Sequence, residues 1–259
     1  HYIEEGDIFQ VNLAQRYVAR LAGDPWSLYR HLRWENPAPF SAYLDYGSFQ
    51  VLSSSPERFL RVDGRRVETR PIKGTRPRAR DPVEDGRRAR ELASSEKDRA
   101  ELAMIVDLER NDLGRVCEYG SVRVERGRAV ESFASVHHLV ATVTGILGPD
   151  ADLVDLLRAT FPGGSITGAP KVRAMEIIDG LERHVRGPYT GAIGYLGFDG
   201  RTDLNVAIRT LVHRDGWCGF QVGGGIVADS EPEAEYQETL DKGRALAAAL
   251  RDAGCEIPL

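Results

Sequence analysis

The sequence predicts an α+β protein built on antiparallel β-sheets. Strand-like runs are interrupted by helical runs at irregular intervals, and many neighbouring strands have the short spacing of hairpins. The chain lacks the strict strand–helix alternation that a doubly wound parallel sheet requires. No internal repeat and no long linker interrupts the sequence, so we treat residues 1–259 as one domain.

The first third of the chain is predicted to be mostly strands. Apolar and polar residues alternate from Phe9 to Leu13, which is the pattern of a half-buried strand. A helix is predicted over Pro25–Glu35, because a proline occupies its first turn and Asn36-Pro37 stops it. The dipeptide Asp63-Gly64 predicts a hairpin turn. Short strands are predicted over Ala42–Asp45, Phe49–Leu52, Phe59–Val62 and Val67–Thr69.

Helices are more frequent in the rest of the chain. The charged segment 76–85 holds Pro77 and Pro82 and is predicted to be an exposed, mobile loop. Apolar residues at helical spacing, among them Leu102 and Ile105, predict one helix over Glu84–Leu113. Strands are predicted over Val122–Val124, Val136–Ile146, Tyr189–Phe198, Leu204–His213 and Cys218–Val222. Helices are predicted over Ala151–Thr160, Pro170–Leu181 and Glu231–Ala253, the last of them capped by Gly254.

Composition excludes several classes of function. The chain has 34 Lys+Arg and 39 Asp+Glu, a net charge of −5, which argues against nucleic acid as the main partner. No apolar run is long enough to span a membrane. The three cysteines are widely spaced and odd in number, so we expect neither a disulfide scaffold nor a zinc site, and a cytoplasmic location. Because the chain begins at His1 without an initiator Met, we expect a preceding segment.

Two glycine-rich stretches have spacings found in nucleotide-binding loops. The stretch 223–228 matches G-x-G-x-x-A after a strand, but no second βαβ strand follows it, so a dinucleotide fold is rejected. The stretch 163–168 has phosphate-loop spacing, but Ala169-Pro170 stands where Lys-Ser/Thr is required. What remains is a run of backbone N–H groups near a helix N-terminus that binds an anion, including a carboxylate.

Two helices carry paired acidic residues. Asp98 and Glu101 are three positions apart on one helix, and Glu235 and Glu238 are three apart on another, with Lys242 four further on. Each pair alone fits a solvated helix surface. If the two pairs face each other, they form the all-oxygen ligand set that Mg²⁺ prefers.

Lys73 is the most specific single candidate for a catalytic residue. It lies in an apolar run between strand-like segments, with Arg70 and Arg76 on either side. It is either a solvated surface lysine or, in an apolar setting among cations, a nucleophile whose pKa is pushed down. His137 and His138 are adjacent in a strand, so their side chains point to opposite faces and cannot bind one metal together.

Ordered sequence blocks run along almost the whole chain. They are SPERF at 55–59, PIKGTRPR at 71–78, DLERNDLGRV at 107–116, FPGGSITGAPKVRAMEIID at 161–179, GAIGY at 191–195, AIRT at 207–210 and GGGIVADS at 223–230. In these blocks the chain resembles the chorismate-utilising enzymes, which include the anthranilate, aminodeoxychorismate, isochorismate and salicylate synthases. The resemblance implies antiparallel sheets packed as a sandwich with helices outside. The family's usual N-terminal domain is not part of this sequence.

The resemblance also bears on the reaction. Anthranilate synthases usually carry Ala where this chain has Lys73, and the chain looks more like the aminodeoxychorismate synthases, which serve p-aminobenzoate and folate biosynthesis. Water-using members carry a base lysine where this chain has Gln10, which fits ammonia as the final nucleophile. No cysteine lies in a glutaminase pattern, so ammonia is expected as free NH₃ or from a separate glutamine amidotransferase. Anthranilate synthase component I remains the alternative.

The resemblance assigns roles to individual residues. Glu57 matches the family's general acid, and Lys73 matches the nucleophile that adds to the substrate ring. Mg²⁺ is expected to bind the ring carboxylate of chorismate through Glu101 and Glu238, with Glu235 and Asp98 in support. The other expected substrate contacts are Arg209, Tyr195, Lys242, the Gly223, Gly224 and Gly225 amides, His138, Thr75, Ser165 and Thr167.

Overall fold

A computed structural model describes residues 1–134 and 136–257 of the chain. The chain forms two compact units. The first unit comprises His1–Pro56, Ile166–Ile193 and Val206–Leu259, and the second comprises Glu57–Ser165 and Gly194–Asn205. Each unit holds one antiparallel sheet and its own helices, so the predicted α+β class is confirmed. That residues 1–259 form one domain stays a prediction.

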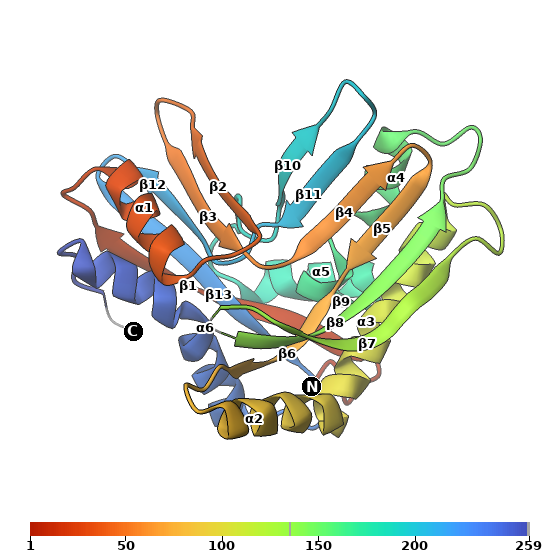
Figure 1. Cartoon of the computed structure of the whole chain (residues 1–259), viewed down its shortest axis with the longest axis horizontal. Helices are drawn as coiled ribbons and strands as arrows, with labels where there is room; N and C mark the ends of the chain where they lie inside the picture. The colour runs from red at the N-terminus through yellow and green to blue at the C-terminus, as the bar shows by residue number, and fades with distance from the viewer. Residues whose placement is uncertain (135, 258–259) are drawn as a thin grey trace. The chain divides into compact units, whose positions relative to one another are not determined.

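The first unit is built on a six-stranded sheet, with strand order β2-β3-β12-β13-β1-β9. Helix α6 packs on β13 and against α1, while α5 packs on β1 (Figure 1). The core between the sheet and the α1–α6 pair contains fully buried leucines, among them Leu52, Leu211 and Leu250. The strands are β1 Gln10–Arg20, β2 Phe40–Asp45, β3 Gln50–Ser55, β9 Gly168–Ala169, β12 Thr210–Arg214 and β13 Trp217–Ile226. The helices are α1 Pro25–Glu35, α5 Lys171–Leu181 and α6 Pro232–Asp252.

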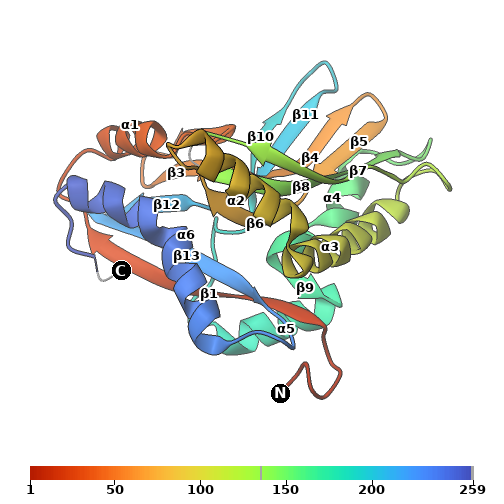
Figure 2. The ribbon, with the colours of Figure 1, turned by 60° about the horizontal axis from the view of Figure 1, so that its bottom comes forward.

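The second unit is built on a seven-stranded sheet, with strand order β10-β11-β4-β5-β8-β6 and with β7 also paired to β8. Helix α3 packs on β8 and β6, and α2 lies beside it (Figure 2). The strands are β4 Arg58–Asp63, β5 Arg66–Arg70, β6 Ile72–Pro77, β7 Arg123–Ser132, β8 Val136–Ile146, β10 Ala192–Leu196 and β11 Thr202–Val206. The helices are α2 Pro82–Ser94, α3 Glu96–Gly114 and α4 Leu153–Thr160, and the short 3-10 turn η1 covers Gly164–Ile166.

Local sequence signals placed several elements correctly. The hairpin at Asp63-Gly64 joins β4 to β5, with Asp63 opposite Arg66 and Gly64 at a φ of 59°. Helix α1 has the predicted bounds, and the Asp24 side chain caps it by accepting from Ser27 N–H. Helix α6 ends two residues before Gly254, whose φ of 80° is the left-handed conformation expected after a helix end.

The loop predicted over 76–85 is shorter than expected and covers only 78–81, while its mobility stays a prediction. Residues up to Pro77 belong to β6, where Arg76 pairs with His137 of β8, and α2 begins at Pro82. The long helix predicted over Glu84–Leu113 is wrong, because Ser95 ends α2 and its side chain caps α3 by accepting from Asp98 N–H. A serine within a charged helical pattern was the signal for this break.

Two further segments differ from their predictions. The strand predicted over Leu204–His213 is two strands in different sheets, because Arg209 adopts a left-handed φ of 49° between them. The glycines 223–225 lie inside β13, paired with β1, and not in a loop before a helix. The loop before a helix expected at that position is therefore wrong, and anion binding by these amides stays a prediction. In the part of the chain that the structure describes, no helix is long and apolar enough to cross a membrane.

Candidate active site

The residues predicted to act on the substrate are divided between the two units. The first unit holds Thr167, Arg209, Gly223, Gly224, Gly225, Glu235, Glu238 and Lys242. The second unit holds Glu57, Lys73, Thr75, Asp98, Glu101, His138, Ser165 and Tyr195.

In the first unit, the acidic residues of α6 lie over the glycines of β13. A Cβ atom on Gly224 would lie 3.5 Å from Glu235 Oε2 and 3.9 Å from Glu238 Oε1. Lys242 Nζ lies 2.7 Å from Glu238 Oε1 and donates to Gly223 O at 3.0 Å. The structure therefore brings together the two carboxylates, the lysine and the glycines that the sequence suggested. A Cβ atom at Gly224 would be in ordinary van der Waals contact with both carboxylates.

A second group in the first unit surrounds the start of β1. Thr167 is buried, and its carbonyl accepts from Asn12 N–H at 2.7 Å. Gln10 is fully buried, and neither polar atom of its side chain has a hydrogen-bond partner among the described residues. A Cβ atom on Gly168 would lie 2.2 Å from Gln10 O, so only glycine allows this approach.

Arg209 lies elsewhere in the first unit, just before β12. It is half-buried, and its carbonyl accepts from Ser54 N–H at 3.1 Å.

In the second unit, Lys73 of β6 points toward α3. Its Nζ lies 3.5 Å from Glu101 Oε2, and the two side chains are only 12% and 16% exposed. A solvated surface lysine is therefore the wrong interpretation. The flanking cations have carboxylates of their own: Arg76 pairs with Asp98 at 3.1 Å, and Arg70 pairs with Glu131. The positive charges of the two flanking arginines, which were expected to act on the Lys73 amine, are thus balanced by these carboxylates.

Gly74 explains how α3 approaches the strand that carries Lys73. Its φ is 74°, and a Cβ atom there would lie 2.7 Å from Asp98 Cγ and 2.8 Å from Leu92 Cδ1. Both distances are shorter than a Cβ atom tolerates, so a side chain at this position would push Asp98 and its helix away from β6.

Replacing Gly74 with Ala should therefore destabilise the protein and disturb the site. Gly64→Ala is the matched control, because Gly64 also has a positive φ but has nothing within 4 Å of a Cβ atom. We expect Gly64→Ala to lower the free energy of unfolding by about 1 kcal/mol, from backbone strain alone. Gly74→Ala adds steric overlap and should cost about 2–4 kcal/mol. Urea denaturation measures both, and equal losses would contradict the close approach to Asp98.

The two adjacent histidines point to opposite faces of β8, as expected. His138 Nδ1 lies 2.9 Å from Thr75 Oγ1, so these two predicted site residues are in contact. His137 lies 2.8 Å from Ser132 Oγ and 3.0 Å from Asp85 Oδ1, and it is 2% exposed. The Arg78 guanidinium beside Asp85 holds the pKa of that carboxyl well below its usual range. His137 is thus a satisfied core histidine.

The remaining predicted residues of the second unit differ in exposure. Glu57 is 4% exposed and Ser165 is 8% exposed, while Tyr195, on the edge strand β10, is 60% exposed. Asp98 and Glu101 lie one turn apart on α3. Among residues 1–134 and 136–257, no three His, Cys, Asp or Glu side chains form a group that holds a metal ion. Each unit contributes one carboxylate pair of the kind Mg²⁺ binds.

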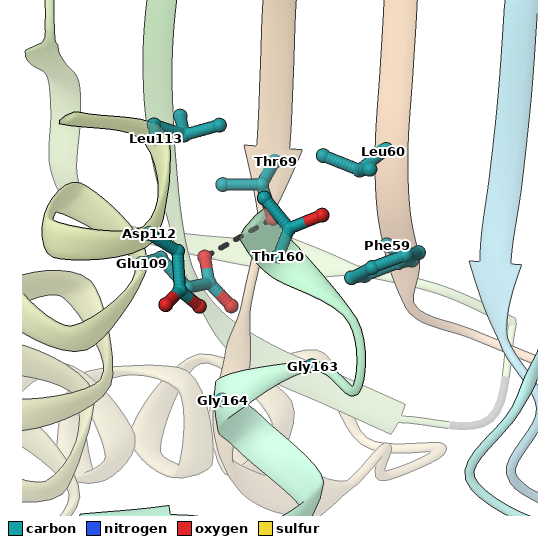
Figure 3. Close-up of a pocket in the computed structure, with 9 residues that line it drawn as sticks. All are labelled: Phe59, Leu60, Thr69, Glu109, Asp112, Leu113, Thr160, Gly163 and Gly164. Carbon is teal, nitrogen blue, oxygen red and sulfur yellow. Dashed lines mark hydrogen bonds between the residues drawn. The ribbon is translucent and has the colours of Figure 1, made fainter. Parts of the chain in front are cut away.

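Sequence reasoning missed a pocket in the second unit. Its lining includes two buried acids of α3, Glu109 and Asp112, which are 7% and 4% exposed (Figure 3). Thr69 Oγ1 of β5 donates to Glu109 Oε2 at 3.1 Å, which ties the strand before Lys73 to the helix of Glu101 (Figure 3). The pocket is lined by Phe59, Leu60, Thr69, Glu109, Asp112, Leu113, Thr160, Gly163 and Gly164. The available signal was the position of Glu109, four residues after Ile105 on the apolar face of α3.

Comparison with known proteins identifies the family. The model of a family described as chorismate binding enzyme matches residues 1–248, and the chain belongs to this family. Aminodeoxychorismate synthase component 1 of Escherichia coli (strain K12) is 56% identical over 241 residues, which are 93% of this chain and 53% of that protein. Anthranilate synthase component 1 1 of Haloarcula marismortui is 53% identical over 252 residues, 97% of this chain and 52% of that protein.

A solved structure agrees with this family. The crystal structure of anthranilate synthase component I from Streptococcus pneumoniae TIGR4 matches with a TM-score of 0.86 and 43% sequence identity, over 94% of this chain and 54% of that one. The chain thus has the fold of the chorismate-utilising enzymes, as predicted. It spans about half the length of the relatives it matches.

Proposed function

We propose that this chain aminates chorismate at C4 and forms 4-amino-4-deoxychorismate, the reaction of aminodeoxychorismate synthase component I. The observation that carries the proposal is Lys73, whose side chain is 12% exposed and whose amine lies 3.5 Å from Glu101. Burial favours the neutral amine that a nucleophile requires, whereas the Glu101 carboxylate beside it favours the charged ammonium. The product would feed p-aminobenzoate and folate biosynthesis, and we expect a cytoplasmic location.

The proposed chemistry proceeds in two substitutions. The neutral Lys73 amine adds to C2, both ring double bonds shift, and the C4–O bond breaks. Hydroxide is a poor leaving group, so Glu57 donates a proton and the oxygen departs as water. Ammonia then adds at C4, both double bonds shift back, and the C2–N bond breaks to release the neutral Lys73 amine. Burial of Glu57, at 4% exposure, favours the protonated carboxyl that the first step requires.

The carboxylates of chorismate need cationic and N–H donors. Arg209 offers a planar fork that matches a carboxylate bidentately, and Tyr195 offers a hydroxyl. Lys242 and the amides of Gly223–Gly225 supply further donors on the same unit as Arg209. His138 and Thr75, with Ser165 and Thr167, are proposed to line the ring.

Magnesium is part of the proposal. Glu101 and Glu238 would hold Mg²⁺, with Glu235 and Asp98 in support, because all four present carboxylate oxygens. When bound, the ion supplies positive charge to the ring carboxylate and draws electron density from the ring. The position of Glu235 and Glu238 over Gly224 supports this assignment, since a Cβ atom there would lie 3.5 Å and 3.9 Å from their carboxylate oxygens.

Ammonia is proposed to come from a separate glutamine amidotransferase. The name of the 56% identical relative, component 1 of a synthase, fits a chain that works with a second component. Anthranilate synthase component I is the second candidate, because a relative with that name is 53% identical over a slightly longer span.

Product identification tests the proposal. The chain is incubated with chorismate, Mg²⁺ and ammonium, and the products are resolved by liquid chromatography and mass spectrometry. We expect 4-amino-4-deoxychorismate that retains its enolpyruvyl group, and no amination when glutamine replaces ammonium. Formation of anthranilate and pyruvate would establish the second candidate instead. Absence of any chorismate consumption would mean that the isolated chain is not an active enzyme.

A further inference from the structure

One edge of β1 is only partly covered by a neighbouring strand. Strand β9 consists of Gly168 and Ala169 alone, and it pairs with Val11 and Gln10. The next donor along that edge, Asn12 N–H, is taken by Thr167 O. Beyond this point the Asn12 carbonyl and the Ala14 N–H would be left without a strand partner. Buried backbone groups of this kind require partners from elsewhere.

Two side chains supply those partners. Glu182 Oε1 accepts from Ala14 N–H at 2.9 Å, and Arg186 Nη2 donates to Asn12 O at 2.7 Å. Arg186 Nη1 donates to Ile166 O at 2.9 Å, while its Nε donates to Glu182 Oε2 at 2.9 Å. The Arg186 and Glu182 side chains are 15% and 7% exposed, so the pair is largely shielded from solvent. The ion pair therefore takes the place of a strand along this part of β1.

The segments held in this way carry predicted substrate contacts. Asn12 and Ala14 are the register partners of Gly225 and Gly223 on the other edge of β1. Ile166 directly precedes Thr167 in the chain. One guanidinium thus connects the strand that supports the glycines to the segment that carries Thr167.

We propose that Arg186 and Glu182 are positioning residues, which fix Thr167 and Gly223–Gly225 relative to each other for binding of the chorismate dianion. This inference rests on the proposed function. Lysine cannot replace Arg186, because a single ammonium does not present the planar fork that reaches two carbonyls and a carboxylate together. Arg186 also lies over the buried Tyr189 ring, 5.7 Å from its centroid, and burial raises the pKa of Tyr189 to about 12, so the phenol stays neutral.

The first test compares Arg186→Lys and Arg186→Met with a matched control, Arg173→Met. Arg173 is in the same unit and also pairs with two carboxylates, Asp7 and Glu176, but it is 41% exposed and has no such contact to β1. Steady-state kinetics with chorismate, Mg²⁺ and ammonium should give a KM for chorismate raised about tenfold or more in both Arg186 variants. The control should leave KM unchanged. A rise in KM of the same size in Arg173→Met would overturn the proposal.

A double variant separates positioning from stability. Arg186→Met alone leaves the buried Glu182 charge without its partner, which destabilises a fold strongly. Replacing both residues, as Glu182→Leu with Arg186→Met, removes both charges and should restore much of the lost thermal stability. If the pair acts as a positioning device, KM stays raised in the double variant and amide exchange at 166–168 stays fast. Recovery of KM together with stability would mean that the pair has a structural role only.

Failure of the proposed function would give a different result. In that case the wild-type chain would form no 4-amino-4-deoxychorismate, and it would either convert chorismate to anthranilate or consume none. Amide hydrogen exchange at Ala14, which needs no substrate, would still report whether Glu182 protects that group. If the exchange rate at Ala14 is unchanged in Glu182→Leu, Glu182 does not hold that part of β1, and the positioning role of the pair is overturned whatever the chain's activity.

Discussion

Replacing Lys73 with Ala is expected to lower the rate of chorismate amination by more than about a thousandfold, because the variant lacks the amine that we propose forms the bond to C2. The Lys73 side chain is 12% exposed and lies 3.5 Å from Glu101 Oε2. Truncation to Ala removes the amine and leaves β6 otherwise able to pair with β8. The variant also loses the cation beside the largely buried Glu101 carboxylate, so a lower thermal stability is expected, and the rates are compared at a temperature at which both proteins are folded.

Intact-mass measurement makes this prediction sharper. Incubation of the wild type with chorismate and Mg²⁺, without ammonium, should produce a covalent adduct that Lys73→Ala cannot form. Lys97→Ala is the control, because Lys97 is an exposed lysine at the start of α3. It should keep both the adduct and the rate. An adduct of undiminished yield in Lys73→Ala would remove Lys73 from the role of nucleophile.

Much of the fold followed from short-range signals. The Asp63-Gly64 turn, the proline at the start of α1 and the glycine after α6 each act within a few residues, and each was predicted from the sequence. The errors arose where a single residue breaks a continuous pattern. Arg209 takes a left-handed φ of 49° within a run of strand-forming residues, and Ser95 interrupts a helical charge pattern. At Arg209 the backbone conformation departs from the local strand propensity, whereas Ser95 is a local capping signal that the continuous helical pattern obscured.

The candidate site was predicted mainly through the family resemblance, and the structure adds contacts within each unit. Spacing alone put Asp98 and Glu101 on one helix face, but it could not reveal that Gly74 makes room for Asp98. Arg186 and Glu182 were missed for a clear reason. Their partners are backbone atoms of β1 more than 160 residues away in the sequence, and no pattern in the sequence marks a carbonyl or an N–H group that lacks a strand.

Removing one carboxylate from the proposed magnesium set should weaken both metal binding and catalysis. We expect Glu101→Gln and Glu238→Gln each to lower kcat/KM by about a hundredfold or more, because an amide oxygen carries no charge to hold Mg²⁺. Chelation of the metal with EDTA should abolish wild-type activity, and added Mg²⁺ should restore it. Glu96→Gln and Glu233→Gln are the controls, since both residues are exposed and lie in the first turns of the same two helices.

Rate alone would not establish a metal ligand, because Glu101 and Glu238 also have lysine partners. Glu101 lies 3.5 Å from Lys73 Nζ, and Glu238 lies 2.7 Å from Lys242 Nζ, so either substitution also changes the surroundings of a cation. The deciding measurement is titration calorimetry of Mg²⁺ into the chain with chorismate present. If Glu101 and Glu238 are metal ligands, both variants should bind Mg²⁺ more weakly and aminate more slowly. If these glutamates act only as partners of Lys73 and Lys242, amination should slow while the affinity for Mg²⁺ stays unchanged. That second result would exclude Glu101 and Glu238 as metal ligands.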